Sequence, residues 1–418
     1  MDAVIALESA RRVHVEEACG QPARLGGLLA SEVGSRRRQG RTDLTIVAGV
    51  VVAEPPWARA ARAGGATIEA LMAGRGLDAA GDAAVAVPIG YADIARGFAD
   101  GRLEVDTVCI STTQTGSLGI QHGYVPDAVS AARDHGGRVL VERNASLPEI
   151  AGAPLVDLDG AVVVDVDTDP VEAVVRPPSA AERTAAAHAA RLVPDRGCVQ
   201  VGIGTIGDAF CGELARASAR GVVLHSGMLG DGVIELADSP VLGTEHPSGL
   251  PPLLASSLIG SRALFAWART EPRVRLAHTG AIHPVAVTAA IPRFCAVNFA
   301  LEVDLAGNVG AEAAGGRTLS GPGGQLDFAT GACAAPGGRS IVVLASSTTA
   351  TPTRPARSRI VAKLSGPTTT PASRVHYVVT EHGVAELAGR TLDQRAAALV
   401  AIADPAFRCD LRSTLAGP

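Results

Sequence analysis

At 418 residues the chain is long enough to form two domains with their own hydrophobic cores. Hydrophobic residues make up 47% and charged residues 19%, a balance that excludes an intrinsically disordered chain. The net charge of -5 argues against nucleic-acid binding, and the absence of an apolar run of about 18 residues argues against a membrane span. The first residues lack the order of a secretory signal, so we expect a cytoplasmic protein.

Short runs of β-branched residues alternate with helical stretches along the whole chain. The predicted strands are residues 43–53, 106–111, 138–142, 197–204, 221–227, 285–289, 294–305, 339–346 and 374–380. The predicted helices are residues 126–137, 179–194, 207–218 and 391–403. This alternation predicts an α/β protein with mostly parallel sheets. A Pro- and charge-rich connection over 166–184 predicts two α/β domains, 1–175 and 176–418.

The seven cysteines lie far apart, and most of them stand within apolar runs. This distribution predicts reduced, buried thiols rather than disulfides or a CxxC metal site. A catalytic cysteine is the alternative interpretation. The histidines show no HExxH or other metal-ligand spacing, so no bound metal is expected.

The segment SGPGGQLDF, residues 320–328, is the clearest local motif. Gly321, Gly323 and Gly324 let the backbone approach a ligand and expose N–H groups, which suits an anion or a thioester. Gln325 adds a side-chain amide to the same loop. A tight turn without a ligand is the alternative interpretation.

The segment VVLHSGMLGDG, residues 222–232, runs from a predicted strand into a glycine-rich turn. Ligands bind at the carboxyl ends of strands in open α/β sheets, so His225, Ser226 and Asp231 are candidate catalytic residues. Neighbours in sequence seldom form the geometry of a catalytic triad, so a turn without a catalytic role is the alternative.

Two further segments are candidates for binding an anionic ligand. VGIGTIGDAF, residues 201–210, follows a predicted strand and opens a helix whose N-terminus suits a phosphate or a carboxylate. A close crossing of helix and strand explains its glycines equally well. ARSRIVAKL, residues 356–364, carries Arg359 and Lys363, which suit a phosphate-rich cofactor. A solvated, charged strand is the alternative there.

Taken in chain order, these motifs resemble the acetyl-CoA hydrolase/transferase family, whose typical member is 4-hydroxybutyrate CoA-transferase. The match is densest from about Phe294 onward, through FCAVNFALEVDLAGNVGAE, SGPGGQLDFATGA, SRIVAKL and RVHYVVTEHGVAEL. Upstream, VGIGTIGDAF is similar to the family's LGIGGIPDAV stretch. The resemblance covers roughly residues 85 to 410, and the first 80 residues match poorly.

The resemblance implies two related, open α/β domains of the CoA-transferase type, with an active site between them and a CoA thioester as substrate. In this family a glutamate attacks the acyl-CoA thioester and then carries CoA as a glutamyl thioester. The family's GGQ loop lies against the thioester, and the matching residues here are Gly321, Gly323, Gly324 and Gln325. The basic SRIVAKL segment is expected to help bind CoA.

The chain departs from the family pattern in two motifs. The family's strand-end motif H-S/T-E-M-x-S-D-G reads HSGMLGDG here, so Gly227 stands where the catalytic glutamate is expected. The family's SPPDxxGYxSLG motif reads STTQTGSLG over residues 111–119, three residues shorter and without Pro-Pro-Asp. Both departures concern the side of the acyl acceptor, whereas the CoA-side motifs are retained.

These features leave three functional interpretations open. The first is direct acyl transfer from a CoA or carrier-protein thioester to an amine or hydroxyl, or its hydrolysis, with loop N–H groups stabilising the oxyanion and His225 or another group accepting the proton. The second is a non-catalytic paralogue that binds a CoA thioester or a partner. The third is conventional CoA transfer with a substitute carboxylate such as Glu235 or Glu381. The expected partners are an acyl-CoA or acyl carrier protein and a small-molecule acceptor, and a homo-oligomer is compatible with the sequence.

Overall fold

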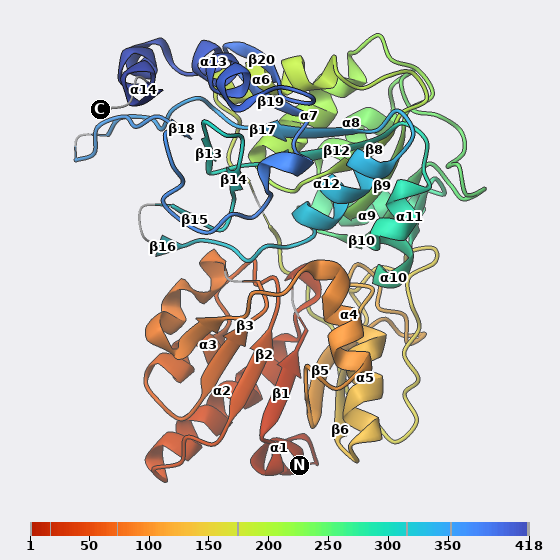
Figure 1. Cartoon of the computed structure of the whole chain (residues 1–418). Coiled ribbons are helices and arrows are strands. Elements are labelled where there is room, and N and C mark those ends of the chain that lie inside the picture. The colour runs from red at the N-terminus through yellow and green to blue at the C-terminus, as the bar shows by residue number, and fades with distance from the viewer. Residues whose placement is uncertain are drawn as a thin grey trace. The chain divides into compact units, whose positions relative to one another are not determined.

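The computed structural model describes residues 2–16, 18–72, 74–173, 175–314, 317–351 and 353–415. The chain divides into two compact units. The first comprises Met1–Val174, Ala255–Ile282 and Leu319–Gly323, and the second comprises Val175–Leu254, His283–Thr318 and Gly324–Pro418. Helices and mostly parallel strands make up both units, so the predicted fold class is confirmed (Figure 1). The domain limits proposed from the sequence, 1–175 and 176–418, stay a prediction.

The first unit is built around a seven-stranded parallel sheet in the order β4-β3-β2-β1-β5-β6-β7. Its strands are β1 (Arg12–Val15), β2 (Thr45–Ala48), β3 (Thr67–Ala70), β4 (Ala84–Ala86), β5 (Thr107–Thr112), β6 (Arg138–Asn144) and β7 (Val162–Val166). Its α-helices before residue 174 are α1 (Asp2–Ser9), α2 (Ala23–Arg38), α3 (Pro56–Arg62), α4 (Tyr91–Ala99) and α5 (Val125–Asp134). The short helices η1 (Ala18–Gly20) and η2 (Arg75–Ala83) lie between them. Its later segment carries α9 (Arg262–Thr270), β11 (Val274–Leu276), α10 (Thr279–Ile282) and most of β10 (Leu253–Leu258).

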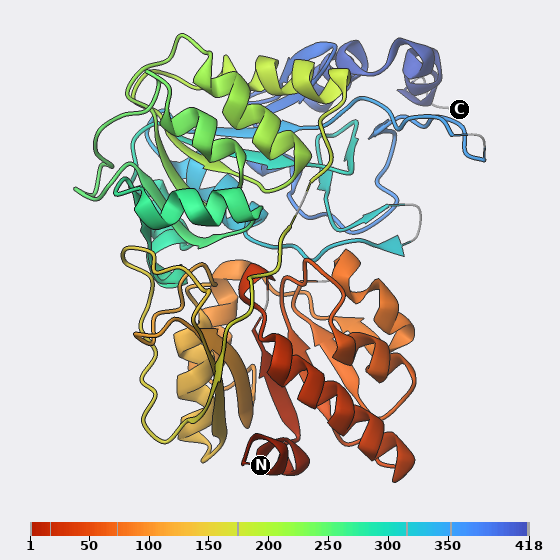
Figure 2. The same ribbon diagram turned by 180° about the vertical axis from the view of Figure 1, so that it is seen from behind.

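The first sheet is covered by helices on both faces, because successive side chains of a strand point to opposite sides. Ile46 on β2 packs in one core with residues of α1, α2 and α3. The next residue, Val47, packs in a second core with residues of α4 and α5. Figure 1 shows α4 and α5 in front of the strands, and Figure 2 shows α2 in front from the other side.

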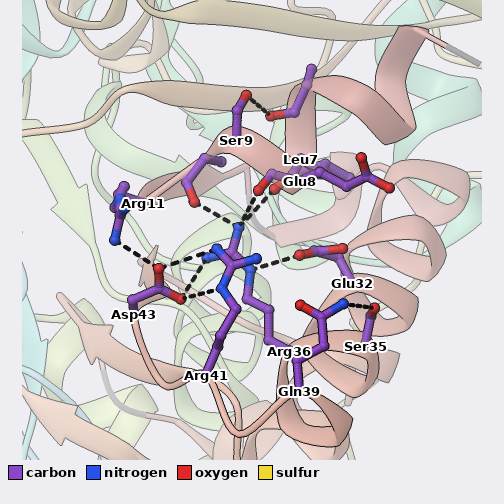
Figure 3. Close-up of polar contacts among 12 residues, drawn as sticks. Leu7, Glu8, Ser9, Arg11, Glu32, Ser35, Arg36, Gln39, Arg41 and Asp43 are labelled. Carbon is purple, nitrogen blue, oxygen red and sulfur yellow. Dashed lines mark hydrogen bonds and ion pairs between the residues drawn. The ribbon is translucent and has the colours of Figure 1, made fainter.

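A buried arginine fastens α1 to α2 in the first unit. Arg36 on α2 is fully buried, and its Nε donates to Glu32 Oε1 at 2.6 Å. Its second terminal nitrogen donates to the backbone carbonyls of Leu7, Glu8 and Ala10 at the end of α1 (Figure 3). The guanidinium therefore satisfies carbonyls that have no partner within the helix.

We expect Arg36→Ala to be among the most destabilising single changes in the first unit. It leaves the Glu32 carboxylate and three carbonyls without their buried partner, and breaking such a pair typically costs about 3–5 kcal/mol. Arg36 also pairs with Asp43, at 3.3 Å. Arg11→Ala removes a more exposed ion pair with the same Asp43 and should leave the free energy of unfolding nearly unchanged. Denaturant unfolding of both variants checks this, and equal stabilities would contradict it.

The second unit contains the strand run β9-β8-β12-β17-β19-β20, parallel except for the last pair. These strands are β8 (Cys198–Val201), β9 (Val223–Leu229), β12 (Phe294–Phe299), β17 (Arg339–Val343), β19 (Tyr377–Thr380) and β20 (Gly383–Glu386). The helices of the unit are α6 (Ala180–Ala190), α7 (Thr205–Ala215), α8 (Gly232–Ala237), α11 (Val285–Ala289), α12 (Gln325–Ala334), α13 (Leu392–Ile402) and α14 (Arg408–Leu415). The short 3-10 helices η3 (Ala372–Arg374) and η4 (Pro405–Phe407) also belong to it. Small sheets are formed by β13 (Glu302–Asp304), β14 (Val309–Gly310) and β18 (Ile360–Val361), and by β15 (Ala313–Ala314) with β16 (Arg317–Thr318).

Helices also cover both faces of this second sheet. The helix α12 contacts β12 and β17 and lies in front of the strands in Figure 1. The helix α6 contacts β17 and β19 and lies, with α7, in front in Figure 2. The capping boxes of Ser179 with Glu182 and of Thr391 with Gln394 fix the starts of α6 and α13.

One predicted strand of the second unit is wrong. Residues 285–289, VAVTA, form the helix α11, which begins directly after Pro284 and packs on α12. A five-residue apolar run has no periodicity that distinguishes strand from helix, and proline favours a helix start. Within the described residues, no helix is both long and apolar enough to cross a membrane.

Candidate functional site

The predicted catalytic residues lie on β9 and in the turn that follows it. The ladder between β8 and β9 pairs Cys198 with Val223 and Val199 with Leu224. Beyond it, the Ser226 hydroxyl donates to the Val201 carbonyl at 2.9 Å and lies 3.3 Å from the Val201 amide. The fully buried Ser226 side chain thus takes the place of backbone hydrogen bonds between β8 and β9 at this point.

A histidine that the sequence motifs did not single out lies against this strand end. A β-carbon placed on Gly227 would lie 2.8 Å from Cε1 and 3.0 Å from Nε2 of His283. A β-carbon placed on Gly324 would lie 2.8 Å from Nδ1 of the same ring. The imidazole is 2% exposed, and its centroid lies 4.8 Å from that of Phe328 on α12. The two segments that carry Gly227 and Gly324 therefore meet at one imidazole, within the second unit.

His225 belongs to a different hydrogen-bonded pair on the same strand. Its Nδ1 lies 3.2 Å from Nε2 of His246, and the two rings stack at 5.1 Å. Burial and, to a smaller extent, the neighbouring His225 lower the pKa of His246 to about 4. The Ser248 amide donates to His246 Nδ1 at 3.1 Å, so both sides of the His246 ring are engaged. The proposed role of His225 as proton acceptor stays a prediction.

Asp231 lies at the start of α8, beside a pocket on the second unit. The pocket has a volume of about 520 Å³ and is lined by residues of α6, α7 and α8, including Asp231, Asp208 and Glu235. Burial is the largest influence on Asp208 and raises the pKa of its carboxyl. The Gly232 amide donates to Asp208 Oδ1 at 2.9 Å, which ties α8 to α7.

Each glycine of the glycine-rich loop is favoured by a different feature of its surroundings. Gly323 has a φ of +58°, a conformation that favours glycine. A β-carbon on Gly321 would lie 2.8 Å from the Leu71 carbonyl oxygen, so the loop approaches the backbone closely there. Gly324 has an ordinary φ of -91°, and the atoms nearest to a β-carbon there belong to the His283 and Phe328 rings.

Gln325 begins α12 directly after this loop. Its Nε2 is buried and has no hydrogen-bond partner among the described residues. A buried amide donor without a partner is costly, so the position favours a ligand that supplies an acceptor. A thioester carbonyl oxygen is such an acceptor.

The two predicted basic residues of SRIVAKL differ in their surroundings. Lys363 is exposed. Arg359 is half-buried, and within the described part of the chain its guanidinium makes no hydrogen bond or ion pair. Burial lowers the pKa of Arg359, partly offset by Glu182, which is itself paired with Arg176. Arg359 is therefore the better placed of the two to receive an anionic group.

In the first unit, the altered motif STTQTGSLG begins on the last two residues of β5. The Thr113 amide donates to the Ser117 carbonyl at 2.8 Å and closes a tight, largely buried turn. Nearby, His122 Nδ1 hydrogen-bonds the Tyr91 hydroxyl, and burial is the main cause that lowers the pKa of His122 to about 3. His122 Nε2, Thr112 Oγ1 and Gln121 Oε1 are buried without a hydrogen-bond partner in the described residues.

The proposed substitute carboxylates are both engaged elsewhere. Glu235 forms an ion pair with Arg216. Glu381 accepts hydrogen bonds from the Ser346 amide at 2.9 Å and the Ser346 hydroxyl at 2.6 Å. Each carboxylate therefore has a local structural partner.

Five of the seven cysteines are buried, Cys333 is half-buried and Cys409 is exposed. Burial raises the pKa of Cys295 to about 12 and raises the pKa values of Cys109, Cys198 and Cys211 further. Buried thiols of this kind are poor nucleophiles. Within the described residues, no group of three or more His, Cys, Asp or Glu side chains is arranged to hold a metal ion.

Two solved structures show the same fold as this chain. RipA from Yersinia pestis has a TM-score of 0.86 and 23% sequence identity, over 99% of this chain and 96% of that chain. The 4-hydroxybutyrate CoA-transferase from Porphyromonas gingivalis has a TM-score of 0.76 and 24% identity, over 99% and 95%. These similarities establish the CoA-transferase fold.

Sequence comparison establishes the family. The 4-hydroxybutyrate coenzyme A transferase of Clostridium kluyveri is 30% identical over 359 residues, which are 82% of this chain and 78% of that protein. The succinyl-CoA:acetate/propanoyl-CoA:succinate CoA transferase of Fasciola hepatica is 31% identical over 77% of this chain and 67% of that protein. The family model of the acetyl-CoA hydrolase/transferase C-terminal domain matches residues 260–415. The chain belongs to the acetyl-CoA hydrolase/transferase family.

Proposed function

We propose that the protein transfers the acyl group of an acyl-CoA thioester directly to water, a hydroxyl or an amine, without a glutamyl-CoA intermediate. The relatives named above are CoA transferases, which supports a CoA thioester as the substrate. The single observation that carries the proposal is the lack of room for a carboxylate at residue 227. The His283 ring lies 2.8 Å from the point where its first side-chain atom would stand.

Two groups of the second unit fit an acyl-transfer reaction. Gln325 Nε2 is a buried donor that can give a hydrogen bond to the thioester oxygen as negative charge develops on it. Arg359 is the half-buried cation that suits a phosphate of CoA. Ser226 holds the strand end in place rather than attacking the substrate, because its hydroxyl is bonded to Val201.

Conventional CoA transfer with a substitute carboxylate is the third interpretation given above. Glu235 and Glu381 would have to leave Arg216 and Ser346 to act as the nucleophile. The ion pair of Glu235 and the hydrogen bonds of Glu381 orient these carboxylates toward their own partners rather than toward a substrate. We therefore favour direct acyl transfer over conventional CoA transfer.

Incubation of the wild-type protein with a panel of acyl-CoAs tests the proposal. Each thioester is supplied with water alone, with carboxylates, and with amines or alcohols, and the products are separated. We expect free CoA with a carboxylic acid, amide or ester. A new CoA thioester formed from the added carboxylate would favour conventional transfer. Binding of CoA without any product would favour the non-catalytic paralogue.

A further inference from the structure

The pocket at α6, α7 and α8 lies on the other face of the second sheet from the glycine-rich loop's helix. Figure 2 shows α6 and α7 in front of this sheet, whereas α12, which begins at Gln325, lies in front from the opposite side in Figure 1. The volume of the pocket, about 520 Å³, is in the range of small-molecule sites. The pocket is therefore separate from the groups assigned above to the thioester.

Small and apolar residues form the walls of this pocket. A β-carbon on Gly232, at the start of α8, would lie 2.6 Å from the Asp208 Cα atom. A β-carbon on Gly212, on α7, would lie 2.9 Å from Glu235 Oε2. These glycines let α7 and α8 approach each other closely. The apolar lining residues are Pro178, Ala209 and Ile234. The walls thus offer contact area to the apolar part of a ligand.

The charged groups of the pocket are mostly negative. They are the carboxylates of Asp208, Glu213, Asp231 and Glu235 and the guanidinium groups of Arg183 and Arg216. Arg216 lies 2.5 Å from Glu235 and 3.9 Å from Glu213, so this cation is shared by two carboxylates. The exposed Arg183 donates to the Pro178 carbonyl at 2.6 Å. The lining therefore favours a cation over an anion.

Asp208 is the carboxylate of the pocket that most needs a cation. Within the described residues its side chain accepts one hydrogen bond, from the Gly232 amide at 2.9 Å, and forms no ion pair. The side chain is half-buried, and burial is the main cause that raises the pKa of its carboxyl, with a smaller contribution from Asp231. A positive charge entering the pocket would offset both effects.

The composition of the lining suits an organic cation better than a metal ion. Across the part of the chain that the structure describes, no three His, Cys, Asp or Glu side chains are grouped to hold a metal. The pocket is also much larger than a bare ion, and Ala209 and Ile234 offer no ligand atoms in their side chains. An ammonium group can donate to a carboxylate while an apolar stem covers such residues.

We propose that this pocket binds an organic ammonium ion with an apolar stem, at a site separate from that of the thioester. The ammonium group donates to the Asp208 carboxylate, and the stem contacts Ala209 and Ile234. Asp208 lies on α7 and Ile234 lies on α8, so the bound ion joins the two helices. Binding to the folded chain alone therefore raises its stability.

Titration calorimetry of the 418-residue chain with 2-phenylethylammonium chloride and with 2-phenylethanol tests this proposal. The two probes have nearly the same size and shape, but only the first carries a charge. We expect the ammonium ion to bind at least about tenfold more tightly, because a hydrogen bond to a charged group is lost in the alcohol. Equal affinities, or no binding of the ammonium ion, would overturn the proposal.

Three variants locate the bound ion. Asp208→Asn keeps an acceptor for the Gly232 amide but removes the charge, so we expect at least about tenfold weaker binding. Ala209→Leu keeps the charge and fills the pocket, and we expect it to abolish binding. The control is Asp393→Asn, which changes an exposed carboxylate that, like Asp208, lies in the first turn of a helix.

Thermal unfolding of each variant without ligand shows whether it is folded. We expect Asp393→Asn to bind the ammonium ion as the wild type does. An amine that bound at the thioester site instead would bind Asp208→Asn and Ala209→Leu with wild-type affinity, and this result would overturn the proposal. Loss of binding in Asp208→Asn alone would mean attraction to a surface charge rather than occupation of the pocket, and would overturn it as well.

Discussion

Gly227→Glu alone should give a destabilised protein that forms no glutamyl-CoA adduct. The first carbon of the new side chain would lie 2.8 Å from Cε1 of His283, and such overpacking typically costs about 1–3 kcal/mol. The new carboxylate would also be buried beside the Phe328 ring, and burying a charged group there destabilises the fold. Denaturant unfolding measures the first effect, and intact-protein mass after treatment with acyl-CoA and borohydride measures the second.

The double variant Gly227→Glu/His283→Ala is the decisive companion. Removing the ring frees the space that the glutamate needs, so we expect the double variant to regain stability relative to Gly227→Glu and to form a trapped adduct. Gly27→Glu is the matched control, because a β-carbon on Gly27 meets no atom within 4 Å. A trapped adduct in the single variant would contradict the account of His283 as the occupant of that space.

Gly324→Val should abolish detectable binding of CoA thioesters while leaving most of the fold intact. Its β-carbon would lie 2.8 Å from His283 Nδ1 and 3.0 Å from Phe328 Cε2, so the ring and the start of α12 must shift. A displacement of about 1 Å in a binding site commonly costs about 10²-fold. Titration calorimetry with several acyl-CoAs measures the loss against the wild type.

Gly34→Val provides the comparison for that change. The nearest atom to a β-carbon at Gly34 is the end of the Arg38 side chain at 3.5 Å, which can move. We expect Gly34→Val to bind CoA thioesters as the wild type does. Unchanged binding by Gly324→Val would mean that the glycine-rich loop serves only as a turn.

The sequence predicted the alternation of strands and helices well, because buried parallel strands read as short β-branched runs. The run VAVTA was the exception, since its five residues fit either element and Pro284 decided for the helix α11. Several strands of the first unit were missed, including β1, because RVHV is short and carries charged and polar residues.

The candidate site was only partly predictable. The family resemblance pointed to Gly227, Gly324 and Gln325, which are distinctive in their motifs. His283 lies in AIHPVAV, a segment without any local catalytic pattern, and only the fold brings it to the end of β9. The reason for glycine at 324 also needed the structure, because the crowding comes from a ring that is distant in sequence.

The most direct test of the central claim follows isotope-labelled acetate with the wild-type protein and unlabelled acetyl-CoA. A glutamyl-CoA enzyme returns CoA to any acetate present, so label enters acetyl-CoA before the thioester is consumed. Direct acyl transfer predicts unlabelled acetyl-CoA throughout, while free CoA accumulates with water or an amine as the acceptor. Rapid exchange of label into acetyl-CoA would contradict the account and show that a carboxylate nucleophile is present.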